Sequence, residues 1–165
     1  MIKYLVALIL LTFGFWDDEN PKEMAANAYV DQYKDLAIVE MHRSGIPASI
    51  TLAQALHESG VGQSDLALFA NNHFGIKCFS RRCAKGHCTN AFDDHHKDFF
   101  RKFKSPKDSW RAHSKLVSGG RYAHLQKYGK DYKKWANGLK AAGYATDKKY
   151  ASKLINTIEK YQLYR

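Results

Sequence analysis

The sequence predicts an α+β domain that is mainly helical and carries one small β-lobe. Its 165 residues are 45% hydrophobic and 13% aromatic, which suits a single globular domain with a substantial core. Most of the chain has apolar residues at helical spacing, whereas residues 78–103 combine glycine, cysteine, paired histidines and short aromatic runs. We expect the β-hairpin or loop-rich lobe in that segment.

The first sixteen residues differ in composition from the rest of the chain. Lys3 precedes thirteen uncharged residues (4–16), and acidic and polar residues follow at once. As a helix this run would span about 20 Å, less than the ~30 Å hydrocarbon core of a bilayer. We interpret residues 1–16 as a secretory signal peptide, with a membrane tether through residues 4–16 or a buried N-terminal helix as alternatives. Residues 17–165 then form the single domain.

Three helices are expected before the β-lobe. Asn20 and Pro21 supply an N-cap and a first-turn proline for a helix that ends at Gly45. A second helix should cover ASITLAQALHES and end at Gly60, and a short third one should lie in SDLALFA.

Three further helices are expected after the β-lobe. Ser105 and Pro106 begin the first of them, with Asp108 in its first turn. The other two should cover residues 131–142 and 147–163, separated by the turn GYAT.

The charge of the chain is strongly positive but unevenly distributed. With 26 Lys and Arg against 16 Asp and Glu, the net charge of +10 favours polyanionic partners such as nucleic acid, anionic lipid or an acidic cell-wall polymer. However, the thirty-three residues from Ser44 to Ile76 contain no Lys or Arg. We expect this basic-free segment to be mostly interior or the wall of a cleft.

Glu58 is the candidate general acid. Glu58 and Asp65 are the only acids of the basic-free segment, and Thr51, Gln54 and Glu58 recur at i, i+3 and i+7 of the second helix. The C-terminal end of a helix and partial burial both raise the pKa of a carboxyl group, which prepares it to donate a proton. From the residues alone, Glu58 is either a catalytic acid or a structural carboxylate.

Three cysteines recur every five residues, at Cys78, Cys83 and Cys88. This spacing is neither the CxxC of a redox site nor that of a zinc ribbon. In an exported protein we expect one disulfide among them and one thiol left over, without the sequence showing which. Zinc bound by these thiols and a neighbouring histidine is the alternative; we expect no metal and no cofactor.

Three segments resemble glycoside hydrolase family 73, namely IPASITLAQALHESG, the loop NNHFGIK and the turn AGYATDKKYA. The members of this family are lysozyme-like endo-β-N-acetylglucosaminidases that cut peptidoglycan. The resemblance covers nearly everything from residue 29 to residue 163. It implies a lysozyme-like α+β fold in which helices frame a groove and a small β-lobe forms one of its walls.

The resemblance also implies roles for individual residues. Glu58 matches the general acid that protonates the glycosidic oxygen, and Tyr144 matches a tyrosine that lines the groove and orients the sugar. Asn72, Phe74 and Gly75 match a loop that closes the site. Gln54, one turn before Glu58, contacts the sugar, the carboxyl group or a structural partner. The expected substrate-binding residues are Gln54, Asn72, Phe74, Gly75 and Tyr150.

The second catalytic carboxylate is where the chain departs from the family. Members commonly carry a glutamate in the β-lobe, proposed as the base that activates water. Here that place falls at or near His87, and no glutamate occurs between Glu58 and Glu159. The available substitutes as base or water-positioning group are His87, Asp93, Asp94 and Asp98. Attack by the substrate's own 2-acetamido group is the alternative route.

We therefore expect an exported, monomeric peptidoglycan hydrolase of the periplasm or cell envelope. It would cleave the β-1,4 bond between N-acetylglucosamine and N-acetylmuramic acid, with Glu58 as general acid and peptidoglycan strands, not nucleic acid, as partner. N-acetylmuramidase specificity and a catalytically impaired cell-wall-binding protein are the alternatives. A nucleic-acid-binding protein and a zinc-dependent amidase or peptidase are more distant ones.

Overall fold

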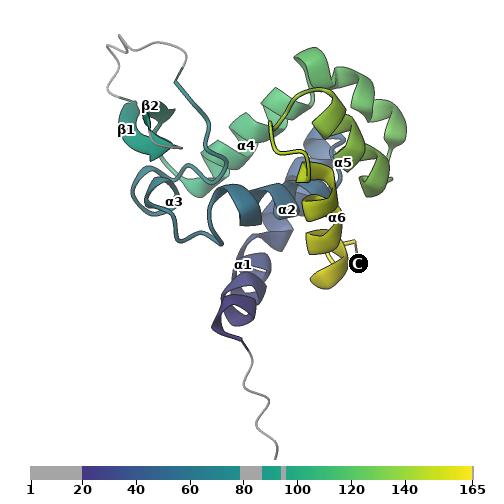
Figure 1. Ribbon diagram of the computed structural model, residues 1–165, viewed down its shortest axis with the longest axis horizontal. Helices are drawn as coiled ribbons and strands as arrows, with labels where there is room; N and C mark the ends of the chain where they lie inside the picture. Colours follow the sequence, from purple (N-terminus) through teal and green to yellow (C-terminus); the bar gives the residue numbers. More distant parts are fainter. Residues whose placement is uncertain (1–19, 79–86, 94–95, 165) are drawn as a thin grey trace, which may run out of the picture.

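The computed structural model describes residues 20–78, 87–93 and 96–164 and shows a mainly helical α+β domain with one small hairpin (Figure 1). In chain order the elements are α1 (Pro21–Ser44), α2 (Ala48–Glu58), α3 (Asp65–Ala70), β1 (Cys88–Asp93), β2 (His96–Arg101), α4 (Pro106–Val117), the 3-10 helix η1 (Gly120–Tyr128), α5 (Tyr132–Ala141) and α6 (Tyr150–Lys160). The predicted fold class is confirmed.

The segment expected to be a signal peptide (1–16), Cys83 and Asp94 lie outside the described residues. Within the described part, no helix has the length and apolar character needed to cross a membrane.

Helix α2 lies at the centre of the domain. Its residues from Ser49 to Leu56 are all buried, and it packs against α1, α5 and α6. A helix that is apolar nearly all round is stable only inside a protein, because no face of it gains from contact with water. The interior position expected for the basic-free segment is therefore confirmed for α2.

Local sequence signals set the ends of the first and fourth helices as expected. The Asn20 side chain accepts a hydrogen bond from the Lys22 amide at 3.0 Å, and Gly45 closes α1 with a left-handed φ of 75°. At the start of α4, the Ser105 hydroxyl accepts from the Asp108 amide at 3.3 Å and donates to the Asp108 carboxylate at 2.9 Å. Such reciprocal caps satisfy amides that have no partner inside the helix.

The β-lobe is a two-stranded antiparallel hairpin. Strand β1 pairs with β2 from Cys88 opposite Arg101 to Asp93 opposite His96, and β1 also contacts α3. In Figure 1 the hairpin stands beside α3, on the side of the molecule away from α5 and α6. The two sides of the domain therefore face each other across the C-terminal end of α2.

The C-terminal half contains one helix that the sequence pattern did not predict. Helix η1 buries Tyr122 and Leu125, three residues apart, which is the repeat of a 3-10 helix rather than of an α-helix. Helices α5 and α6 are shorter than expected, because residues before and after them form turns. Asp131, for example, is the N-cap of α5, where its carboxylate accepts from the Lys134 amide at 3.0 Å.

Candidate active site

A groove of about 740 Å³ runs past the C-terminal end of α2. Its volume is in the range of pockets that hold small-molecule ligands. One wall comes from the end of α2 and the turn before α6, and the other from α3, the loop after it and the hairpin. The residues that line it are Glu58, Ser64, Asp65, Leu66, Phe74, Gly75, Lys77, Asn90, Phe100 and Tyr144.

Glu58 is the last residue of α2 and is exposed in this groove. The chain turns away directly after it through three consecutive left-handed residues, Gly60 (φ 55°), Val61 (φ 61°) and Gly62 (φ 77°). The buried hydroxyl of Ser59 accepts a hydrogen bond from the Gly62 amide at 2.7 Å and holds the turn. Glycine adopts such φ values without strain, so the two glycines end the helix and leave the carboxyl group facing the groove.

Two tyrosines stack beside Glu58 on the helical wall. The ring centroids of Tyr144 and Tyr150 are 5.5 Å apart with nearly parallel planes. Burial raises the pKa of Tyr144 well above its usual range and also raises the pKa of Tyr150, and the negative charge of Glu58 raises both further. Both phenols therefore stay protonated at neutral pH and lie within electrostatic reach of the Glu58 carboxyl group.

The burial of Gln54 argues against a direct contact between its side chain and the sugar. Its side chain is fully buried, and its amide nitrogen donates to the Tyr150 hydroxyl at 2.8 Å. Only 6% of the surface of Tyr150 is exposed. Of the three readings left open for Gln54, the geometry favours the structural partner: Gln54 positions Tyr150, which in turn stacks on Tyr144.

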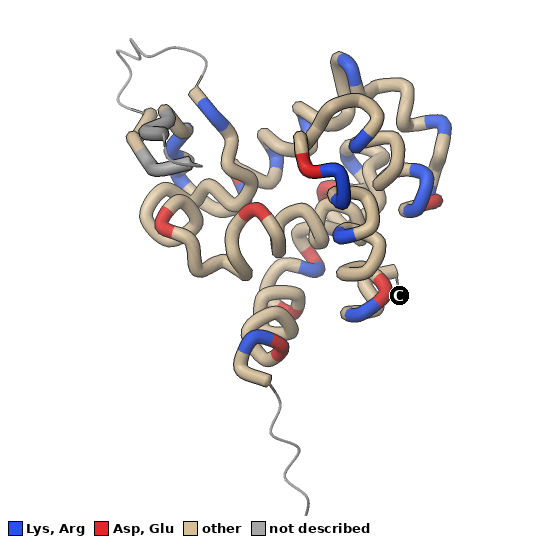
Figure 2. The backbone as a smooth tube through the Cα atoms, viewed as in Figure 1, with Lys and Arg blue, Asp and Glu red and all other residues tan. Residues whose placement is uncertain are grey.

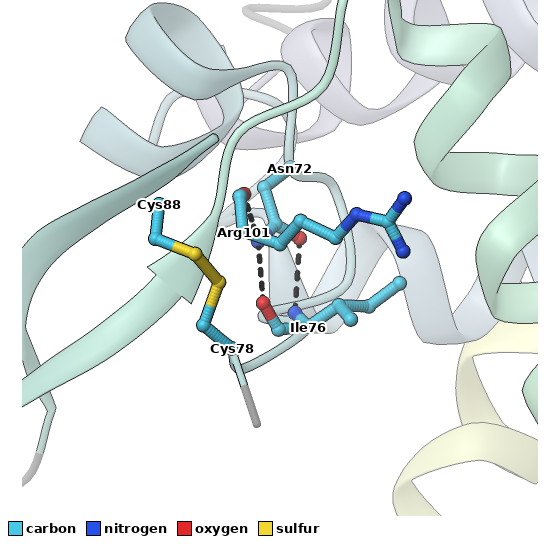
Figure 3. The surroundings of a disulfide bond; sticks show 5 residues. All are labelled: Asn72, Ile76, Cys78, Cys88 and Arg101. Atoms are coloured by element: carbon cyan, nitrogen blue, oxygen red, sulfur yellow. Dashed lines mark hydrogen bonds between the residues drawn. A yellow bond between two sulfur atoms is a disulfide. The ribbon is translucent and has the colours of Figure 1, made fainter. Parts of the chain in front are cut away.

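Asn72 also holds other groups in place and is itself fully buried. Its side-chain nitrogen donates to the Ile76 and Arg101 carbonyls, each at 2.9 Å, and its side-chain oxygen accepts from the Ile76 amide at 3.0 Å. Figure 3 shows these residues at the base of the hairpin, next to the disulfide. We therefore revise the expected role of Asn72 from substrate contact to positioning of the loop 71–77 against β2.

Phe74 and Gly75, from the same loop, line the groove as expected. Behind the groove the Phe74 ring stacks on His113, with centroids 4.0 Å apart. His113 is fully buried, neither ring nitrogen has a hydrogen-bond partner among the described residues, and burial lowers its pKa to about 3. A neutral imidazole thus supports Phe74 from within the core.

Among the described residues that line the groove beside Glu58, none is one of the expected second groups, and the side chains of Asp93 and Asp98 lie outside the described part of the structure. His87 lines a different cavity, together with basic residues of β2 and α4. Asp93 is the last residue of β1, three residues beyond the groove-lining Asn90. At about 3.3 Å per residue its backbone lies roughly 10 Å further along the strand. Asp94 is outside the described residues.

A residue that the sequence reasoning did not select, Asp65, is the second carboxylate of the groove lining. Its place in the basic-free segment is the sequence feature that could have identified it, because Glu58 and Asp65 are the only acids there. Figure 2 shows the tube from α2 through α3 without a Lys or Arg, whereas basic residues occur over the other helices. The groove therefore contains two carboxylates at the basic-free edge of a protein of net charge +10.

Cys78 and Cys88 form a disulfide that ties the loop after α3 to the start of β1 (Figure 3). The expectation of one disulfide is confirmed, and Cys83 lies outside the described residues. The potential ligand atoms of Cys78, His87 and Cys88 all lie within 4.8 Å of one another. Because the two sulfurs are bonded to each other, they are not available as the thiolates that zinc requires.

Similar sequences are found among known proteins. Residues 34–163 match the sequence profile of the family Glucosaminidase, described as mannosyl-glycoprotein endo-beta-N-acetylglucosaminidase. The exo-glucosaminidase LytG of Bacillus subtilis is 34% identical over an alignment of 148 residues that covers 82% of this chain and 51% of LytG. The chain thus spans about half the length of that relative.

Solved structures show the same fold. The catalytic domain of the autolysin Auto from Listeria monocytogenes gives a TM-score of 0.72 at 27% identity, over 86% of this chain and 88% of that one. A peptidoglycan hydrolase from Sphingomonas sp. A1 gives 0.70 at 30% identity, over 83% and 90% of the two chains. The family match runs from the second half of α1 to the residues after α6 and so includes both walls of the groove.

Proposed function

The chain belongs to the glucosaminidase family of glycoside hydrolases, and from that premise we propose that it cleaves peptidoglycan with Glu58 as general acid. The bond proposed is the β-1,4 linkage between N-acetylglucosamine and N-acetylmuramic acid. The observation that supports this most directly is the exposed Glu58 carboxyl group at the end of the central helix, in a groove lined by Tyr144.

In the proposed reaction Glu58 gives its proton to the glycosidic oxygen as the bond to the anomeric carbon breaks. Its position at the C-terminal end of α2 brings this carboxyl group to the groove in which the glycan would bind. Tyr144, which stays protonated, offers a hydroxyl group and an aromatic face to the sugar in the groove. Phe74 and Gly75 line the same groove and would contact the glycan strand there.

The substrate class is supported by relatives and by charge. The protein from Sphingomonas is described as a peptidoglycan hydrolase and LytG as an exo-glucosaminidase. Peptidoglycan carries lactyl and peptide carboxylates, and the net charge of +10 would attract such a polymer. Export, through the signal peptide or tether expected in residues 1–16, would bring the enzyme to this substrate in the periplasm or cell envelope.

The test is digestion of purified peptidoglycan by the protein and by its Glu58→Gln variant. We expect the protein to release new reducing ends and the variant to be slower by ~100-fold or more, since general acid catalysis contributes ~10²–10⁴-fold. Glu159→Gln, which changes an exposed, ion-paired carboxylate on α6, is the matched control and should keep full activity. Equal rates for Glu58→Gln and the control would refute the role of Glu58.

Product analysis identifies the bond. After borohydride reduction, mass spectrometry should find reduced N-acetylglucosamine at the new chain ends, whereas reduced N-acetylmuramic acid would establish muramidase specificity. Long fragments early in the digest indicate endo cleavage, and single disaccharides indicate the exo mode named for LytG. Binding to peptidoglycan without the release of any new reducing end would instead support the alternative, a catalytically impaired cell-wall-binding protein.

A further inference from the structure

We infer that Asp65 is the base that activates water in the proposed reaction, so that the enzyme inverts the anomeric carbon. The inference rests on the proposed function and assigns its missing second group. Asp65 and Glu58 are the two carboxylates among the residues that line the groove. Asp65 would take the part proposed for the β-lobe glutamate of the family, from a different element of the fold.

The turn between the two residues places them at separate sites of one groove. Glu58 ends α2, whereas Asp65 is the first residue of α3, after the turn 59–64. The Ser64 hydroxyl accepts from the Ala67 amide at 3.2 Å, and the Ser64 amide donates to the Ser59 carbonyl at 2.9 Å. Hydrogen bonds at both ends of the turn therefore fix where α3 starts and where Asp65 lies.

Asp65 belongs to the hairpin side of the groove. Besides the groove itself, it lines a small cavity together with Thr89 and Asn90 of β1. Tyr144, by contrast, comes from the helical wall behind Glu58. A sugar bound between the walls would have the proton donor on one side and Asp65 on the other. An inverting glycosidase needs its carboxyl groups ~6.5–9.5 Å apart with a water between them, and this is the spacing that we infer for Glu58 and Asp65.

The Asp65 carboxylate is also available. It is exposed and forms no hydrogen bond or ion pair with the described residues. Most other described acids are engaged: Glu40 with Arg43, Asp147 with Lys153 and Glu159 with Lys133. A carboxylate that lines the groove without a protein partner is free to accept a proton from water.

The step balances with water as the only co-reactant. The oxygen of a water molecule forms a bond to the anomeric carbon while one of its protons passes to Asp65. On the other side the bond from that carbon to the glycosidic oxygen breaks, and the oxygen takes the proton of Glu58. The β-glycoside becomes an α-configured hemiacetal, and solvent then returns the proton from Asp65 to Glu58.

The first test is the configuration of the product, measured by proton NMR on soluble, peptide-free glycan oligomers before the new ends equilibrate. We expect the α-anomer to appear first. The β-anomer appearing first would overturn the inference, because it indicates retention through the substrate's acetamido group. Glu58 serves as acid on either route, so this outcome would leave the proposed function intact.

The second test compares Asp65→Ala with Asp35→Ala, which removes an exposed acid of α1 outside the groove. We expect kcat to fall by ~100-fold or more for Asp65→Ala, with little change in KM, and to stay unchanged for Asp35→Ala. Added azide, which needs no base, should restore turnover of Asp65→Ala and yield an α-glycosyl azide. A purely structural loss would not respond to azide, so loss without rescue, or full activity of Asp65→Ala, would refute the role of Asp65.

Discussion

The two walls of the groove are held in place by different kinds of interaction. The helical wall, which carries Glu58, continues directly into the core through α2, whose residues from Ser49 to Leu56 are buried. The hairpin wall, which carries Asn90, stands outside that core on two strands. It is joined to the rest by the hydrogen bonds of Asn72, by backbone hydrogen bonds between the loop 71–78 and β2, and by the Cys78–Cys88 disulfide.

This difference predicts how each wall responds to substitution. Apolar burial is shared among many side chains, so the helical wall should tolerate the loss of one polar contact. Directional hydrogen bonds made by a single buried side chain are lost together when that side chain is removed. The hairpin wall should therefore be the more sensitive of the two to a single change.

The largest effect is expected for Asn72→Ala. The substitution removes three hydrogen bonds and leaves the Ile76 amide and the Ile76 and Arg101 carbonyls without this partner. We expect the free energy of unfolding, measured by urea titration, to fall by about 3 kcal/mol. Hydrolysis of peptidoglycan should also slow, because the loop 71–77 then keeps only its backbone hydrogen bonds to β2, such as the one that the Arg101 amide donates to the Ile76 carbonyl at 2.9 Å.

Asn137→Ala is the control for this comparison. Asn137 is exposed on α5, and its amide donates to the Lys133 carbonyl of the same helix at 2.8 Å. Its removal should change the free energy of unfolding by less than about 0.5 kcal/mol. If the free energy of unfolding falls equally little in both variants, the side chain of Asn72 does not hold the hairpin wall in place.

A smaller effect concerns the dependence of stability on pH. Burial lowers the pKa of His113 to about 3, whereas in the unfolded chain it is near 6.5. Between these values the unfolded state binds one more proton than the folded state, so stability is lost as pH falls below about 6.5. The slope from this one group is at most about 1.4 kcal/mol per pH unit.

His113→Leu isolates this contribution. Because neither ring nitrogen has a partner, the substitution leaves no donor or acceptor unpaired among the described residues. The free energy of unfolding should fall less steeply between pH 6.5 and 5 than in the unaltered protein. Part of the slope should remain, since burial also lowers the pKa of His73, to about 4. A slope identical to that of the unaltered protein would show that His113 becomes charged within the fold.

Sequence reasoning predicted the helical wall well because its signals are local. Two glycines after Glu58 and a segment free of basic residues indicate where α2 ends and that it is buried. The match of the segments ESG and GYAT to a known family identified Tyr144 as a residue of the groove. The glycines and the family motifs can be recognised within a few residues, and the basic-free segment within one continuous stretch of the chain.

The hairpin wall was predicted less well because its geometry depends on contacts between distant residues. The lobe itself was expected, but His87 lines another cavity and the groove includes Asp65 instead. The turn 59–64, held by backbone hydrogen bonds, decides where Asp65 lies, and no periodicity of the sequence shows this. Likewise an amide such as Asn72 reads equally well as a ligand contact or a buried support until its burial is known.

The smallest effect tests the helical wall, through the hydrogen bond from Gln54 to the Tyr150 hydroxyl. Gln54→Met keeps the approximate shape of the side chain but removes the donor, and Tyr150→Phe removes the hydroxyl. Each single variant should lower the free energy of unfolding by about 1 kcal/mol. The double variant should lose about 1 kcal/mol less than the sum of the two, because both substitutions remove the same bond.

Measuring kcat distinguishes the effect of this hydrogen bond from the effect of general packing. Tyr150 stacks on Tyr144, whose ring lines the groove, so a shift of Tyr150 should lower kcat by a few-fold without abolishing it. Combining the two substitutions should add little further loss of kcat. Additive losses in both stability and kcat would mean that Gln54 and Tyr150 act independently, and that the helical wall is positioned by apolar packing alone.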